Sequence, residues 1–427
     1  MQALNRGHEM TTVPDSVRGY NPIADDTLAD PFPEYAQIRK SCPIAHSDSL
    51  EVPFWVLFTY EDVRNALLDH KTWSARYGLS PVFQKSIGFA ADGREHTQFK
   101  AIWRRRLASP KTMSSLRVDI ERIAENLLNA MLAKGPEVEL HDDFALPLPI
   151  KVISLLLGIP SDDYPQLKRW SDALMDNAFG KSNSDYLATY AGVCEFFDGY
   201  LDARYALLAD AGVDEPHMDH VGTILPDDWI SEAVCEDFLG RKLTRDEQRV
   251  ALMGLLVGGN ETTTSLITNL MWRLLEEPSR WAAVKADPDR LIPIAIEESL
   301  RFDSPVLGMF RTSLCPVTSN GVEIPEKQKL MIAYASANHD PAVFEDPDTF
   351  RLDRDPESLK KIATFGFGRH TCPGANLSRM EVDIVMRLFV TMMPDVTING
   401  PTQRSAGYNF WGRRQLPLLV SSATTQI

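Results

Sequence analysis

Apolar residues recur at helical spacing through most of the chain. The clearest case is the segment 114–135, where one stripe of large apolar side chains is followed by a glycine that ends the pattern. Apolar positions three and four residues apart lie on one face of an α-helix, so this pattern predicts a helix over 115–134 that packs its stripe into a core. The stripe consists of Leu116, Ile120, Ile123, Leu127, Leu128 and Met131.

Similar patterns predict a fold made mainly of α-helices with a small β portion. A run rich in β-branched and aromatic residues, Val52–Phe58, predicts a strand, and short strands are expected mostly after residue 305, with turns and a hairpin over 404–421. Residues 1–31 are polar and rich in turn formers, which predicts an N-terminal arm, and residues 32–427 are expected to form a single domain. Further helices are predicted over 61–70, 95–107, 145–157, 163–177, 185–211, 244–276 and 293–302, and after Pro373.

Composition narrows the class of protein. Of the 427 residues, 44% are hydrophobic and 24% are charged, which is typical of a folded globular chain. The formal net charge of -15 argues against a nucleic-acid partner, and five scattered cysteines predict neither a disulfide framework nor a zinc site. No apolar run reaches the roughly 18 residues of a membrane span, and the first residues lack the apolar region of a signal peptide. We therefore predict a cytoplasmic protein with no membrane partner.

One cysteine occupies a position that suits an anionic ligand. Cys372 ends the glycine-rich run FGFGRHTC at 365–372 and precedes Pro373, a residue suited to the first position of a helix. The positive end of the helix dipole and the loop amides stabilise a thiolate there. A buried cysteine in a turn is the simpler interpretation, but it does not account for the glycines, Phe365 and His370 at fixed offsets.

The pattern F-G-x-G-x-H-x-C-x-G at residues 365–374 resembles the heme-binding signature of the cytochrome P450 superfamily, the heme-thiolate monooxygenases. The resemblance implies the cytochrome P450 fold, with heme b between a long central helix and the cysteine loop. It implies that Cys372 is the axial ligand of the heme iron and that Phe365 packs against the heme on the same side. A thiolate ligand donates electron density to iron and favours cleavage of the O–O bond, so O2 is the expected co-substrate.

The middle of the predicted helix 244–276 carries residues that are poor helix formers, GGNETTT from Gly258 onward. A threonine at this point can bond back to the carbonyl four residues earlier, and for Thr262 that carbonyl belongs to Gly258. Gly258 and Gly259 let the helix pass close to a flat cofactor and leave room for O2, while Glu261 and Thr262 offer an acid and an alcohol for a proton relay. The family has the same residue types at this spacing; taken alone, the segment is equally compatible with a kink that carries no chemistry.

The propionates of a heme require cations, and the family resemblance implies four of them here. His370 lies two residues before the cysteine, Arg311 follows the turn at Pro305, and His96 begins the family pattern H-x-x-x-R. Lys100 takes the place of the arginine in that pattern and is a point charge in place of a bidentate fork. Trp103 or Arg104, also on the predicted helix 95–107, is the alternative for this contact.

Glu298 and Arg301 resemble the E-x-x-R motif that holds the segment before the heme loop in this family. Taken alone, an acid and an arginine three residues apart indicate a surface ion pair on a helix. The third member of the motif, an arginine before a phenylalanine, is replaced by Thr349. Arg351 and Arg354 are the candidates that compensate for it.

The resemblance implies an enzyme that inserts one oxygen atom from O2 into a small hydrophobic organic substrate, by hydroxylation or oxidative demethylation. Electrons from NAD(P)H would arrive through a separate ferredoxin and ferredoxin reductase, or a flavodoxin, because the sequence contains no flavin or iron–sulfur segment. The alternatives are a heme-binding module without turnover and a peroxide-driven oxidase, and Glu261 with Thr262 argues against both. A monomer is expected, and the run Arg104–Arg106 is either a solvated face or a docking surface for an acidic ferredoxin.

Substrate contacts are predicted from apolar residues at the positions where the family builds its pocket. The candidates are Phe83, Val306, Leu307 and Phe410, each of which could instead belong to the core. An apolar pocket favours a hydrophobic organic molecule.

Overall fold

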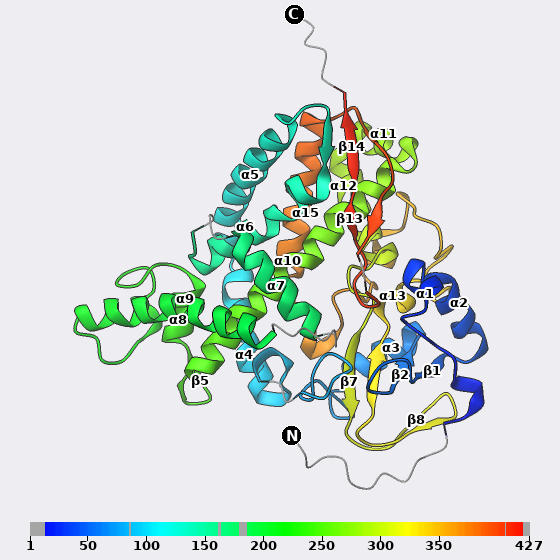
Figure 1. The fold of residues 1–427 in the computed structure, drawn as a ribbon, viewed down its shortest axis with the longest axis horizontal. Helices are drawn as coiled ribbons and strands as arrows, with labels where there is room; N and C mark the ends of the chain where they lie inside the picture. The colour runs from blue at the N-terminus through cyan, green and yellow to red at the C-terminus, as the bar shows by residue number, and fades with distance from the viewer. Residues whose placement is uncertain (1–12, 85–86, 161–163, 179–185, 406, 422–427) are drawn as a thin grey trace, which may run out of the picture.

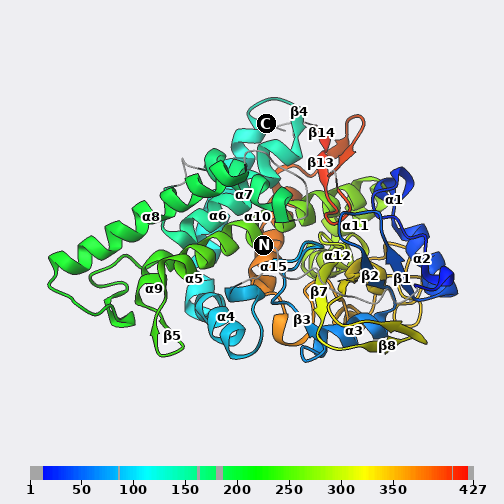
Figure 2. The same cartoon turned by 60° about the horizontal axis from the view of Figure 1, so that its bottom comes forward.

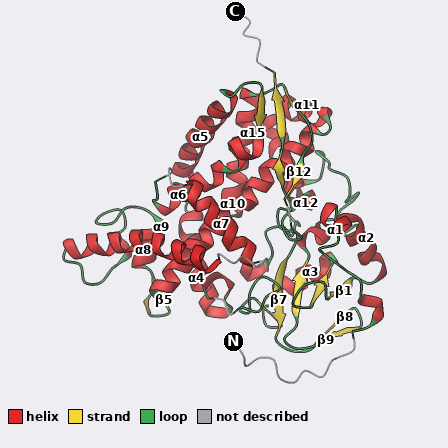
Figure 3. Cartoon of the chain, in the orientation of Figure 1, coloured by secondary structure: helices red, strands yellow, loops and turns green. Residues whose placement is uncertain are grey.

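The computed structural model describes residues 13–84, 87–160, 164–178, 186–405 and 407–421. Helices dominate the chain (Figure 3), as the hydrophobic pattern predicts, and the β portion is small. The longer helices are α2 Phe32–Ser41, α3 Tyr60–Leu68, α4 Gly93–Leu107, α5 Pro110–Leu132, α6 Pro147–Leu157, α7 Tyr164–Ala178, α8 Tyr186–Asp210, α9 Trp229–Cys235, α10 Arg245–Leu275, α11 Pro278–Ala286, α12 Pro288–Phe302 and α15 Ala375–Met392. The shorter ones are α1 Asp25–Ala29, α13 Tyr334–Asn338 and α14 Pro356–Leu359.

Helix α10 crosses the middle of the helical part of the molecule (Figure 1). It begins at a capping box, in which the Thr244 hydroxyl accepts from the Glu247 N–H and the Glu247 carboxylate accepts from the Thr244 N–H. At 31 residues it spans about 46 Å. Its apolar side chains are buried around the whole circumference, because α6, α7, α12 and α15 all pack on it.

The β portion is built around a five-stranded sheet in the order β1-β2-β10-β7-β3. Its strands are β1 Ile44–Ser47, β2 Phe54–Leu57, β3 Trp73–Ser74, β7 Met309–Ser313 and β10 Lys329–Ile332. Strand β10 runs parallel to β2 and antiparallel to β7, so Lys329 lies opposite both Phe54 and Thr312. Both faces of the sheet are covered by apolar side chains, which explains why β2 and β10 are buried along their whole length.

The end of the chain differs in part from the expected hairpin. Strand β12 Gln403–Arg404 pairs with β13 Arg413–Gln415, as a hairpin should. Strand β14 Pro417–Val420, however, pairs with β11 Val396–Ile398 and with β4 Glu137–Glu139. Local patterns predict a strand but do not identify a partner that lies nearly 280 residues away. Two further small hairpins join β5 Asp237–Phe238 to β6 Arg241–Lys242 and β8 Val317–Ser319 to β9 Val322–Ile324.

The molecule is elongated between its helical and sheet parts. In Figures 1 and 2, α8 and α9 lie at one end, and α2 and the sheet strands lie at the other. The segment before α1 packs on the sheet end, where Val17 and Tyr20 are buried in its apolar clusters. Among the described helices none combines the length and the apolar character that a membrane span requires.

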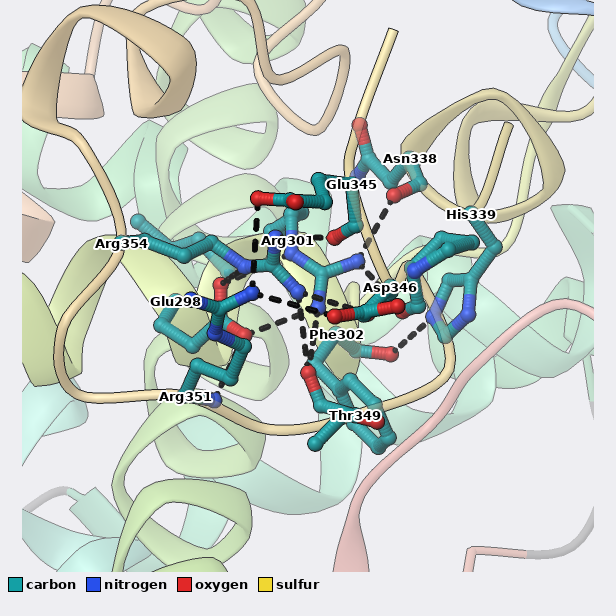
Figure 4. Close-up of polar contacts among 12 residues, drawn as sticks. Glu298, Arg301, Phe302, Asn338, His339, Glu345, Asp346, Thr349, Arg351 and Arg354 are labelled. Carbon is teal, nitrogen blue, oxygen red and sulfur yellow. Dashed lines mark hydrogen bonds and ion pairs between the residues drawn. The ribbon is translucent and has the colours of Figure 1, made fainter. Parts of the chain in front are cut away.

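A buried ionic network on α12 holds the irregular segment 338–364, which leads into the cysteine loop (Figure 4). Arg301 donates to both oxygens of Glu298 at 2.8 Å, and neither side chain has any exposed surface. Arg301 also donates to the carbonyls of Asn338 and Pro347. A buried arginine needs this many acceptors to offset the loss of water.

Arg354 supplies the arginine that Thr349 does not. Its Nε donates to Glu298 Oε2 at 2.7 Å, and its other nitrogens donate to the carbonyls of Glu345, Asp346 and Thr349. Arg351 contributes only its backbone N–H to Glu298, at 2.9 Å, while its guanidinium binds Asp353. Of the two candidates, therefore, Arg354 completes the network.

Candidate functional site

The loop 365–374 turns sharply before it enters α15. Gly366 and Gly368 have φ angles of +68° and +69°, in the left-handed region that residues with a side chain rarely adopt. The loop closes on itself through a hydrogen bond from the Cys372 N–H to the Phe365 carbonyl, at 2.9 Å. A Cβ atom at Gly374 would lie 3.8 Å from the Cys372 sulfur, in ordinary contact. The loop thus presents the sulfur beside the first turn of α15.

The surroundings of Cys372 combine opposing effects on its thiol. Burial among loop atoms raises the pKa of Cys372, whereas the backbone N–H groups of Gly374 and Ala375 and the cations Lys100 and Arg379 lower that pKa. These N–H groups and cations are the partners that a thiolate ligand needs. The residue as a whole nevertheless keeps solvent-accessible surface.

Phe365 lies at the start of the loop and is held from α15. The guanidinium of Arg379 lies over its ring, 4.6 Å from the centroid, and is fixed in turn by an ion pair with Glu297. A cavity of about 440 Å³ borders this region, lined by the end of α14, the loop with Cys372, and the beginning of α15.

The middle of α10 contains the expected bond between Thr262 and Gly258, and we call residues 258–262 the notch. The Thr262 hydroxyl donates to the Gly258 carbonyl at 3.0 Å. A Cβ atom added to Gly258 would meet nothing within 4 Å, so this face of the helix borders open space. A Cβ atom on Gly259 would lie 2.6 Å from the Ile153 side chain of α6. The two glycines therefore serve different purposes: Gly258 leaves space beside the notch, and Gly259 allows α6 to pack closely.

Glu261 is buried beside the notch and has a partner that the sequence did not reveal. Its carboxylate forms an ion pair of 3.2 Å with Lys168 of α7, which also binds Asp172 one turn further along that helix. Next to it, the Asn260 amide donates to the Ser171 hydroxyl at 3.4 Å. Nothing in the local pattern around Lys168 indicates this contact, because its partner lies 93 residues away.

The four residues predicted to face the heme propionates, His96, Lys100, Arg311 and His370, lie near one another beside the cysteine loop. The rings of His96 and His370 are 3.9 Å apart, and His96 Nε2 lies 3.2 Å from the Arg369 carbonyl. Burial, together with Arg311, His96 and Lys100, lowers the pKa of His370 to about 2. Arg311 is buried on β7, opposite Leu330 of β10.

Lys100 points at the backbone of the cysteine loop. Its Nζ donates to the carbonyls of Arg369 and Thr371, at 2.8 Å and 2.5 Å. Burial lowers the pKa of Lys100, and the nearby Cys372 opposes that effect. The alternative contact Trp103 is buried and donates to the Ala251 carbonyl of α10.

The basic run at the end of α4 is only partly free. Arg105 binds Glu236 through two hydrogen bonds, and Arg106 binds Glu232 and Asp227. These pairs join α4 to α9 and to the residues on either side of that helix. The side chain of Arg104 is exposed and has no ion-pair partner among the described residues.

The predicted pocket residues lie in two different regions of the structure. Val306 pairs with Phe410 in an isolated antiparallel bridge, and the Leu307 N–H donates to the Asn409 carbonyl at 2.9 Å. Leu307 is 3% exposed and belongs to the core cluster under the sheet. Phe83, in contrast, is 43% exposed in the loop before α4, and its ring lies over the ammonium of Lys329, 4.8 Å from the centroid.

Comparison with known proteins identifies the family. The family described as cytochrome P450 matches residues 29–392, most of the chain. The chain is 32% identical over 367 residues to the putative cytochrome P450 YjiB of Bacillus subtilis, which covers 85% of this chain and 87% of that protein. It is 31% identical over 372 residues to the vitamin D(3) 25-hydroxylase of Pseudonocardia autotrophica, which covers 84% and 86%. The chain therefore belongs to the cytochrome P450 family.

A solved structure agrees with this assignment. The cytochrome P450 PksS of the Bacillus subtilis bacillaene polyketide synthase superposes with a TM-score of 0.81 at 28% identity, covering 95% of this chain and 100% of that chain. The cytochrome P450 fold predicted from the sequence is thereby confirmed. The chain is a cytochrome P450 monooxygenase, an oxidoreductase that uses heme b and O2.

A heme requires open space and a thiolate for its iron, and it requires cations for its two propionates. The described residues fit both requirements. Gly258 leaves the open space that a flat cofactor needs beside α10, and the loop offers the sulfur of Cys372. Arg311 and Lys100 are cations with no acidic partner among the described residues, next to two histidines. Two propionates would supply the missing negative charge.

Proposed function

We propose that this enzyme inserts one oxygen atom from O2 into a small hydrophobic organic molecule, by hydroxylation or oxidative demethylation. The observation that carries the proposal is the notch in α10, where the Thr262 hydroxyl is fixed by Gly258 beside open space and the residue before it, Glu261, is buried. An acid next to an alcohol held in one orientation can relay protons to a bound group. A heme carrier without turnover needs neither group.

In this proposal Cys372 is the axial ligand, and Arg311, His96, His370 and Lys100 hold the propionate edge. The heme, when bound, supplies the activation of O2. Because the Thr262 hydroxyl donates its hydrogen to the Gly258 carbonyl, its Oγ1 atom is fixed in one orientation and acts as the acceptor that holds the delivered proton in place. Glu261 replenishes that proton, and Lys168 holds the carboxylate in place between turnovers.

The substrate is expected to be apolar. Val306 and Phe410 are brought together from distant parts of the chain by their bridge, and both are candidates for its contacts. The names of two relatives, a vitamin D(3) hydroxylase and a polyketide synthase P450, also indicate bulky hydrophobic molecules as the class to test.

Electrons are proposed to come from NAD(P)H through a separate ferredoxin and ferredoxin reductase, or a flavodoxin. Because Arg105 and Arg106 are held by acids of the same chain, Arg104 is the member of the basic run that remains for an acidic partner. We propose that the enzyme is a monomer.

A substrate screen on the purified holoenzyme tests this function. Macrolides, secosteroids, steroids and terpenoids would be titrated while the heme spectrum is followed, because a substrate that displaces water from the iron changes the spectrum. Compounds that respond would be incubated with O2, NAD(P)H, a ferredoxin and its reductase. A singly oxygenated product supports the proposal. Product that forms with hydrogen peroxide, and never with O2 and the electron donors, would show a peroxide-driven oxidase instead.

A further inference from the structure

Lys329 is an unusual residue for its place in the fold. It begins β10, the central strand of the five-stranded sheet, and is 1% exposed. None of the described acidic residues forms an ion pair with it. Burial and the neighbouring charge of Arg311 lower the pKa of Lys329 to about 7. A buried ammonium is costly unless other groups solvate it, so its contacts indicate what it does.

The contacts of Lys329 all lie in one segment, the loop that follows β3. Its Nζ donates to the carbonyls of Tyr77 at 2.7 Å and of Gly78 at 3.2 Å. The ring of Phe83 covers the same ammonium, with its centroid 4.8 Å from Nζ. Two carbonyls and an aromatic face satisfy the charge in place of water.

The loop has one further attachment to the sheet next to Lys329. The Phe310 N–H of β7 donates to the Leu79 carbonyl at 3.1 Å. Inside the loop, the Gln84 N–H donates to the same Tyr77 carbonyl that Lys329 binds. Lys329 thus holds the point where the loop closes on itself.

The same segment continues toward the site. After Phe83 the chain reaches a single helical turn, Gly88–Ala90, which packs against α10 and α4. A Cβ atom on Gly88 would lie 2.6 Å from the Phe99 ring of α4, so this contact is close. The loop therefore links the sheet at Lys329 to the helix that carries the notch and to the helix that carries His96.

We propose that Lys329 is a positioning residue that fastens the loop 75–84 to the sheet and thereby controls how molecules reach the space beside Gly258. The fastening follows from the contacts alone. The control of access rests on the proposed function, because it assumes that the space beside Gly258 holds the heme.

The fastening is tested by hydrogen exchange of the holoenzyme, followed by mass spectrometry. In Lys329→Met, which keeps the length and loses the donor, the amides of 75–84 should exchange about tenfold or more faster than in the parent. Lys329→Arg keeps the charge and the donors and should restore slow exchange. Lys327→Met is the matched control, because Lys327 lies two residues away with an exposed side chain, and it should exchange as the parent does. If Lys329→Met does not accumulate as a folded protein, Lys329→Gln, whose amide donates to one carbonyl, should show an intermediate effect.

The control of access is measured with 4-phenylimidazole, a bulky azole that binds heme iron and shifts the Soret band. Its association rate should rise severalfold in Lys329→Met, and should return to the parent value in Lys329→Arg. Unchanged exchange of 75–84 in Lys329→Met would overturn the fastening, and an unchanged association rate would overturn the control of access. The reduced carbon monoxide spectrum of each preparation separates these failures from a failure of heme-thiolate ligation, which would already appear in the parent.

Discussion

Thr262 lies where the middle of a long helix borders open space. Its hydroxyl takes the Gly258 carbonyl as acceptor, in a helix that is otherwise buried along its length. The neighbouring Gly258 adds space, because no atom lies within 4 Å of where its Cβ would be. The chemistry proposed for this enzyme depends on that combination of a fixed hydroxyl and open space.

Replacing Thr262 with alanine should separate electron consumption from product formation. Thr262→Ala should still bind heme and substrate and still consume NAD(P)H with its redox partners, but product should fall about tenfold or more, and most electrons should appear as hydrogen peroxide. Thr262→Ser is the matched control, since it keeps the hydroxyl, and should stay close to the parent. Product, peroxide and NAD(P)H measured in one assay show how tightly electron consumption is coupled to product formation. Coupling in Thr262→Ala as tight as in the parent would mean that the notch is only a kink.

The two adjacent glycines of α10 should respond differently to the same substitution. Gly259→Ala places a methyl group 2.6 Å from the Ile153 side chain, so we expect a loss of about 1–3 kcal/mol in the free energy of unfolding. Gly258→Ala meets no atom of the chain and removes a poor helix former, so the stability of the heme-free chain should be unchanged or rise by up to about 1 kcal/mol. Urea unfolding of the heme-free protein compares the pair. Equal losses in both variants would contradict the assignment of the two faces.

The ionic network between α12 and the segment 338–364 fixes the loop that presents Cys372. Glu298 has no exposed surface and accepts from two arginines, and both arginines also bind backbone carbonyls of that segment. A segment whose regular structure is limited to the short helix α14 is thereby given one conformation. The ligand loop follows directly, so its position depends on this network.

Arg354 and Arg351 form a matched pair for testing the network. Arg354→Met leaves the buried Glu298 with one partner fewer, and we expect a loss of about 3–5 kcal/mol in the free energy of unfolding. Arg351→Met removes a guanidinium that binds surface acids and keeps the backbone N–H on Glu298, so its loss should stay within about 1 kcal/mol. Thermal unfolding and heme retention would be measured on both holoenzymes. A larger loss in Arg351→Met would show that the arginines have been assigned the wrong way round.

The elements with strong local patterns could be predicted from the sequence, and those set by distant contacts could not. The helix α5 and the long α10 were predicted within a few residues, because stripes and caps are local. The helices α9 and α11 lie outside the predicted ranges, and β14 pairs with strands that no local pattern identifies. In the site, the bond from Thr262 to Gly258 is local and was predicted. The roles of Lys168 and Lys329 depend on partners 93 and about 250 residues away.

Charge is distributed unevenly over the molecule. The chain carries a net charge of -15, yet the region around His370 gathers Arg311, His96, Lys100 and Arg369. The core also contains an isolated acid, Glu381 on α15, whose Oε2 has no hydrogen-bond partner among the described residues. Burial raises the pKa of Glu381 to about 8.

Glu381 should make stability fall as the pH rises. Its folded pKa lies above its unfolded value, so folding gains from the bound proton at low pH, and this gain is lost as the pH rises through about 8. Glu381→Gln removes the titration while keeping the shape. The melting temperature of Glu381→Gln minus that of the parent should therefore increase from pH 6 to pH 9. A difference that is constant over this range would show that Glu381 is not held neutral in the fold.

The spectrum of the reduced, carbon monoxide-bound protein tests whether Cys372 is the thiolate ligand of the heme. We expect the purified chain to be red and to show the strongly red-shifted Soret band of thiolate ligation, because the loop presents the Cys372 sulfur beside N–H groups and cations. Cys372→Ala should lose that band, while Cys315→Ala, at an exposed cysteine elsewhere in the chain, should keep it. Retention of the red-shifted band in Cys372→Ala would contradict the account.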